Sequence, residues 1–134
     1  MVIAANDYIP VDRRDTTGNV GTYGAVQAYG TTANTAAVTQ LTSRTTGVTI
    51  NSPVGVITLV SAANSATDST FTVTNSFVDI GDVVLVTQRS GTDPRRIAVT
   101  ATAAGSFAIT SASISGTTTE SPVYNFAVIK AALV

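Results

Sequence analysis

The stretch TFTVT, Thr70 to Thr74, decides the fold class. Successive side chains of a β-strand point to opposite faces, so Phe71 and Val73 fall on one side and the three threonines on the other. An apolar pattern with a period of two predicts a strand with one buried face. The same alternation recurs later in the chain, and together these segments give the expected core residues: Phe71, Val73, Phe107, Ile109, Tyr124, Phe126 and Val128.

Short runs rich in Val, Ile, Thr and Phe recur from Val38 onward, separated by clusters of Gly, Asp, Asn, Ser and Pro. Such clusters are typical of turns, and the runs between them are typical of strands. We expect strands at residues 38–42, 48–50, 55–60, 70–74, 83–88, 97–103, 107–111 and 123–130. The sequence therefore predicts an all-β fold: an antiparallel β-sandwich or barrel-like domain of about seven to eight short strands over residues 38–134.

Residues 1–37 differ from the rest, because they mix Pro, Gly, Asn and isolated Tyr without a sustained period. We interpret them as an extended N-terminal arm, which could span at most roughly 120 Å. A DRRD motif at residues 12–15 and three tyrosines could anchor this arm on another protein, since Arg and aromatic residues carry much of the energy of interfaces. The alternative is a disordered tail. The candidate partner-binding residues of the arm are Tyr8, Arg13, Arg14, Tyr23 and Tyr29.

The composition is poor in charge and in reactive side chains. Only 11% of the 134 residues are charged and the formal net charge is −1, against about a quarter charged in an average domain. We therefore expect no direct contact with nucleic acid or membrane, because no long-range field would attract either. Thr favours the pleated backbone and still presents a hydroxyl to water. Sheet edges with so little charge invite further pairing, so we expect assembly with copies or partners.

Candidates for catalysis and metal binding are weak. The chain has neither Cys nor His, which removes thiolate and imidazole ligands and the usual general base. Asp79 and Asp82 flank Gly81 at a spacing that could offer oxygen ligands to calcium, but a tight turn explains them better. Glu120 with an Asp could in principle form a glycosidase pair, yet aromatic residues that would bind a sugar are missing around them. We expect no enzyme activity, no cofactor and no metal site.

The segment SGTDPRRIAV places Asp93 and Pro94 before an arginine pair, Arg95 and Arg96. One interpretation is a turn that enters a strand, with one arginine exposed. The other is that both arginines lie on the rim of an interface and contact a partner, since the planar guanidinium group is favoured there. The sequence leaves both interpretations open.

The segment from about Val38 to Ala131 resembles a β-rich module that recurs in structural proteins of tailed bacteriophages and prophages. The matching segments are VTQLTSRTTGVTIN at 38–51, GVITLVSAA at 55–63, FTVTNS at 71–76, VVLVTQRSGTD at 83–93, GSFAIT at 105–110 and SGTTTESPVYNFAVIKA at 115–131. The chain departs from the pattern at Ser52, where the family would have Lys.

This resemblance implies a small, non-enzymatic and typically trimeric virion protein. We expect a capsid cement or decoration protein: a homotrimer, made in the host cytoplasm, that binds the major capsid protein on the outer surface of the phage head. The alternative is a fibre or host-recognition module at a vertex or tail.

Overall fold

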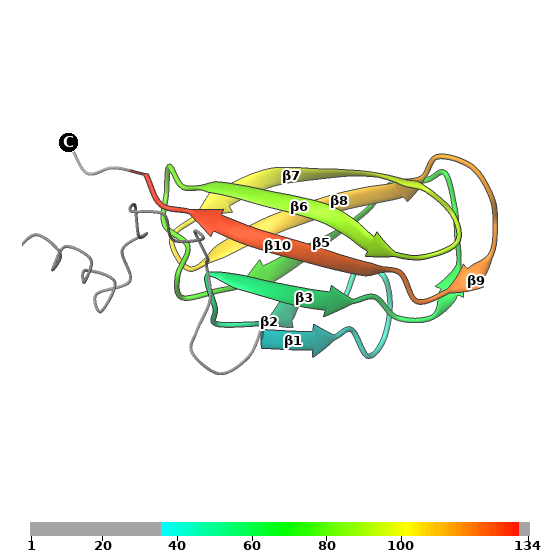
Figure 1. Ribbon diagram of the computed structural model, residues 1–134, viewed down its shortest axis with the longest axis horizontal. Coiled ribbons are helices and arrows are strands. Elements are labelled where there is room, and N and C mark those ends of the chain that lie inside the picture. The colour runs from blue at the N-terminus through cyan, green and yellow to red at the C-terminus, as the bar shows by residue number, and fades with distance from the viewer. Residues whose placement is uncertain (1–35, 132–134) are drawn as a thin grey trace, which may run out of the picture.

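The computed structural model describes residues 36–131, and every regular element in this range is a β-strand (Figure 1). The strands are β1 (Ala36–Thr39), β2 (Val48–Thr49), β3 (Val54–Thr58), β4 (Ala62–Ala63), β5 (Ser69–Thr74), β6 (Val83–Ser90), β7 (Arg95–Ala103), β8 (Ser106–Ser113), β9 (Thr119–Glu120) and β10 (Val123–Ile129). The expected all-β class is confirmed. The described range contains no helix long and apolar enough to cross a membrane.

The strands form two four-stranded sheets and one small pair. Sheet A has the order β1-β3-β10-β6, and sheet B has the order β2-β5-β8-β7. The two sheets lie in separate layers, and β4 pairs with β9 at one end of the molecule, on the right in Figure 1. Within residues 36–131 none of the sheets closes into a barrel, so the barrel-like alternative is wrong.

Each of the eight expected strands overlaps a strand of the structure, but two details differ. The two-residue strands β4 and β9 lie in segments expected to be turns, and β1 begins at Ala36, inside the range assigned to the arm. The expected antiparallel pairing is also only partly right, because β1 pairs parallel with β3 and β2 pairs parallel with β5. Parallel neighbours need a crossover connection. Here the chain leaves sheet A after β1, forms β2 in sheet B, and returns to sheet A as β3.

The core lies between sheets A and B and contains all seven residues expected there. Phe71, Val73, Phe107 and Ile109 come from sheet B, and Tyr124, Phe126 and Val128 come from β10 of sheet A. The rings of Phe107 and Phe126 meet across the layers with centroids 5.5 Å apart. The threonines of TFTVT are exposed, as the alternation predicted.

Ser52, the position at which a Lys was expected from the sequence resemblance, is buried. Its backbone oxygen accepts a hydrogen bond of 2.8 Å from Asn75 Nδ2, which ties the loop before β3 to the end of β5. The Ser52 hydroxyl itself has no hydrogen-bond partner among the described residues, so the contact at this position is made by the backbone and not by the side chain.

Candidate functional site

A cluster of polar side chains lies at the end of the molecule where β4 and β9 pair. We call it the polar cluster; its members are Arg44, Asn64, Asp93, Arg95, Glu120 and Tyr124. They come from separate segments: the loop after β1, the residue after β4, the β6–β7 connection, the start of β7, β9 and β10. The cluster therefore joins both main sheets to the small pair.

Asn64 is the centre of the cluster. Its Nδ2 donates to Asp93 Oδ2 at 3.0 Å and to Glu120 Oε1 at 2.5 Å. Its Oδ1 accepts from Arg95 at 2.7 Å and from Arg44 at 3.2 Å. An amide has two donor hydrogens and two acceptor lone pairs, so the hydrogen-bonding capacity of this buried side chain is fully used.

Arg44 fastens the same end through the backbone. Its guanidinium group donates to the carbonyl oxygens of Val60, Ala62 and Glu120, each at 2.8 Å. Burial, followed by the nearby charge of Arg95, lowers the pKa of Arg44. Arg44 is half-buried, whereas Gln40, the other long polar side chain nearby, is buried and donates to the Thr46 carbonyl oxygen at 2.8 Å. Both residues hold the loop after β1 in place.

The two carboxylates of the cluster accept hydrogen bonds from the surrounding backbone. The amides of Thr92 and Asp93 donate to Glu120, and the Thr118 amide donates to Asp93 at 2.9 Å. Hydrogen bonds from Asn64 and from Thr118 lower the pKa of Asp93. Burial acts to raise the pKa of Glu120, but the donors from Thr92, Asn64 and Asp93 outweigh it and the pKa is lowered. Both groups are therefore held as carboxylates.

Arg95 lies inside the domain, with 9% of its surface exposed. Its Nε donates to the Tyr124 hydroxyl at 2.7 Å, and that hydroxyl donates to Ser111 Oγ at 2.8 Å. The side chain of Arg95 therefore lies inside the domain, where its Nε and NH1 groups donate to Tyr124 and Asn64, and a partner contact of Arg95 stays a prediction. The expectation of one exposed arginine in the pair is met by Arg96.

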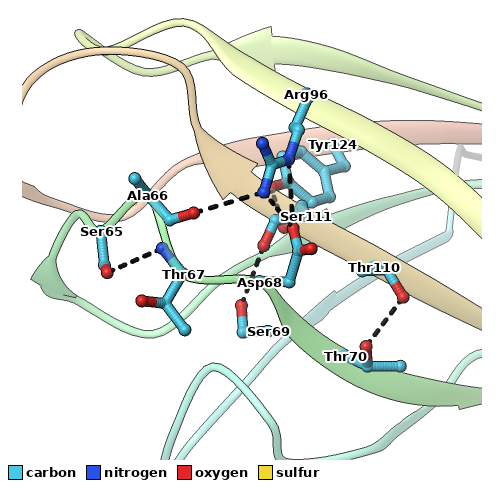
Figure 2. A network of polar contacts seen from close by, with 10 residues as sticks. All are labelled: Ser65, Ala66, Thr67, Asp68, Ser69, Thr70, Arg96, Thr110, Ser111 and Tyr124. Carbon is cyan, nitrogen blue, oxygen red and sulfur yellow. Dashed lines mark hydrogen bonds and ion pairs between the residues drawn. The ribbon is translucent and has the colours of Figure 1, made fainter.

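Arg96 is exposed and pairs with Asp68 within the chain, as Figure 2 shows. Its NH2 group lies 2.9 Å from Asp68 Oδ1 and also donates to the Ala66 carbonyl oxygen at 3.3 Å. An exposed ion pair of this kind contributes little to stability. A partner contact of Arg96 stays a prediction. Tyr8, Arg13, Arg14, Tyr23 and Tyr29 lie outside the described residues.

A second cluster of charged side chains, formed by Asp82 and Lys130, lies at the opposite end of the molecule. Asp82 Oδ1 accepts from the Ala131 amide at 2.8 Å, and Oδ2 lies 2.5 Å from Lys130 Nζ. Gly81 has a φ of +93°, a conformation that favours glycine, and the Asp82 amide donates back to the Asp79 carbonyl oxygen at 3.2 Å. The tight turn expected at this place is confirmed, and the carboxylate of Asp82 ties it to the end of β10.

The chemistry open to the polar cluster is limited by its hydrogen bonds. A general acid that works near neutral pH needs a raised pKa, whereas the pKa values of Asp93 and Glu120 are lowered. Within residues 36–131, no three His, Cys, Asp or Glu side chains lie close enough together to hold a metal ion. The arrangement is a structural hydrogen-bond network, in which buried polar groups provide each other's hydrogen-bond partners.

Sequence reasoning missed Asn64, because an Asn in a Ser- and Ala-rich segment is typical of an ordinary turn. Gln40 and Arg44 carried a usable signal. They are the only long polar side chains of a 22-residue stretch, residues 39–60, made otherwise of small, apolar and short polar residues. Isolated long polar groups in such a stretch are candidates for buried anchors.

No protein-family model matches the chain, and the comparisons with curated proteins and with solved structures also found no match. The resemblance to phage structural modules stays a prediction from the sequence.

The lowered carboxylate pKa values predict how stability depends on pH. A carboxylate with a folded-state pKa below its unfolded value stabilises the fold above the unfolded pKa, and this contribution disappears as pH falls through the folded value. The ordinary values are 3.8 for Asp and 4.5 for Glu. We expect a nearly constant Tm between about pH 5 and 8, and a falling Tm below about pH 4.5.

Thermal unfolding followed by circular dichroism at stepped pH measures this dependence. The Glu120→Gln variant is the control. Its Tm should be lower than that of wild type at neutral pH, and it should fall less steeply as the pH decreases. A wild-type Tm that rises toward pH 3 would contradict the prediction.

Proposed function

We propose that this chain is a structural virion protein: a capsid cement or decoration protein that trimerises on the outer phage head and stabilises contacts between major capsid subunits. The domain would be a β-sandwich formed by sheets A and B, and residues 1–37 would be its attachment arm. The sequence resemblance to phage structural modules supplies the virion assignment.

One structural observation carries the non-enzymatic part of the proposal. Nine of the ten charged side chains in residues 36–131 form hydrogen bonds or ion pairs within the domain. The larger clusters hold segments of backbone together, and their carboxylates are kept ionised. The surfaces that remain are rich in hydroxyl and aliphatic groups. This is what a rigid building block needs, whereas an enzyme needs reactive groups that face a substrate.

Multivalency explains how such a neutral surface could bind a capsid. Three linked copies engage three capsid sites, and each contact raises the effective concentration of the next. No single strong site is required, which fits a domain with few charges.

The direct test is to mix the purified protein with capsids that lack it and to count bound copies by cryo-electron microscopy. Hundreds of copies spread over the head are expected. A few copies at one vertex or at the tail would favour the fibre or host-recognition alternative, and no binding at all would refute the virion assignment.

A separate prediction concerns the contribution of the arm to capsid binding. Deleting residues 1–30 should leave the β domain folded but weaken its binding to capsids at least about tenfold, or about 1.4 kcal/mol, because the contacts of the arm are lost. Circular dichroism checks the fold, and copy number on capsids at several protein concentrations measures the affinity. Equal occupancy by the truncated and full-length proteins would remove the arm from the mechanism.

A further inference from the structure

Large exposed apolar side chains are not spread evenly over the domain. Seven are exposed in the described range, and five of them lie at the end where β6 begins and β10 ends, on the left in Figure 1. We call this group the apolar patch; its members are Phe77, Ile80, Val83, Leu85 and Ile129. The other two, Leu41 and Ile114, follow the ends of β1 and β8 near the polar cluster.

The strand register makes the centre of the patch continuous. Val83 of β6 lies directly opposite Ile129 of β10, and Leu85 follows two residues along the same face of sheet A. Their neighbours Val84 and Val128 point inward and are buried. The outward face of sheet A therefore presents Val, Leu and Ile side by side at this end.

At other outward-facing strand positions this chain carries Thr in place of an aliphatic residue. The outward positions of sheet B carry threonines, among them Thr70, Thr72, Thr74 and Thr100. Thr has nearly the same shape and β-propensity as Val but keeps a hydroxyl in water. The placement of Val83, Leu85 and Ile129 on the outside of sheet A is thus a local exception. Contiguous exposed apolar groups typically mark an interaction surface.

The charges around the patch allow contact between copies of the chain. Asp82 and Lys130 neutralise each other within the chain, and Asp79 lies at the margin with its carboxylate accepting from the Ile80 amide at 2.7 Å. Residues 36–131 as a whole carry five basic and five acidic side chains, because two of the seven basic and three of the eight acidic residues lie in residues 1–35. With a net charge of zero in this range and −1 for the full chain, little net charge is present to select a charged partner or to repel another copy.

We propose that the apolar patch is the contact through which copies of this chain associate. Each copy contributes the same face of β6 and β10, so that Leu85 and Val83 are buried against the patches of the other copies and Asp79 stays at the rim. An apolar centre with a polar rim is the usual composition of such contacts. The number of copies, three, rests on the proposed function, but the contact itself does not.

The experiment compares two leucine variants of the full-length chain, Leu85→Glu and Leu41→Glu. Leu85 is 53% exposed and lies in the patch, whereas Leu41 is 84% exposed and lies near the other end of sheet A. Multi-angle light scattering during gel filtration gives the mass of each protein at several concentrations. We expect wild type and Leu41→Glu to be oligomers, and Leu85→Glu to be a monomer or to dissociate at a concentration at least about tenfold higher than wild type.

Controls keep the outcomes distinct. Circular dichroism checks that Leu85→Glu is folded, and Leu85→Gln, which adds no charge, replaces it if it is not. A monomeric wild type, or a Leu85 variant that keeps the wild-type mass, would overturn the inference. Binding to capsids is scored separately: an oligomer that depends on Leu85 but ignores capsids would refute the proposed function and leave this contact standing.

Discussion

Replacing Asn64 with Asp is expected to lower the free energy of unfolding by about 3 kcal/mol or more. The change removes the two hydrogens that Asn64 donates to Asp93 and Glu120, at 3.0 and 2.5 Å. It also places a third carboxylate within hydrogen-bonding distance of both. Asp93, which is buried, and Glu120, which is half-buried, would each lose a donor and gain a like charge, which costs far more than a lost surface contact.

Urea denaturation at a fixed protein concentration measures this effect. Asn125→Asp is the matched control, because Asn125 is exposed on β10 and the same chemical change there should stay within about 0.5 kcal/mol. The difference between Asn64→Asp and wild type should shrink below about pH 4, since protonation removes the repulsion between the carboxylates. Equal losses for the two Asn→Asp variants would mean that Asn64 does not hold the polar cluster together.

The sequence predicted the strands and the core because a period of two is a local property. Phe71 and Val73 alternate with threonines, so their burial follows from the chain itself. The polar cluster is different, since Asn64 and Glu120 are 56 residues apart and meet only when β4 pairs with β9. No local pattern indicates which turn residue will find a partner across the fold.

The exposed apolar residues of β6 could not be predicted from the sequence for a related reason. The run VVLV at residues 83–86 is apolar throughout, so its sequence does not say which side faces the core. The structure resolves this, because the register with β10 places Val84 inside and Leu85 outside. The parallel pairs of β1 and β2 escaped prediction as well, because a chain that alternates between two sheets has the same local pattern as one that forms hairpins.

The second large effect is expected in the core, where Phe126→Ala should lower the free energy of unfolding by about 3–5 kcal/mol. The Phe126 ring contacts the Phe107 ring, and it also lies over Gly55, its direct partner on β3. A Cβ atom at position 55 would come within 2.6 Å of Phe126 Cε1 and 2.7 Å of Ile50 Cδ1. Gly55 thus makes room for the ring, and Gly55→Ala alone should cost about 1–3 kcal/mol through overpacking.

The two substitutions should not be additive, because they act on the same space. In the double variant the added methyl group enters part of the volume that the Phe126 ring has left, and only the contact with Ile50 remains tight. We expect the double variant to be more stable than the sum of the single effects implies by at least about 1 kcal/mol. Urea denaturation of wild type, the two single variants and the double variant gives the four free energies of unfolding that this double-mutant cycle needs. Simple additivity would show that the cost of Gly55→Ala comes from the contact with Ile50 and that the ring of Phe126 does not depend on Gly55.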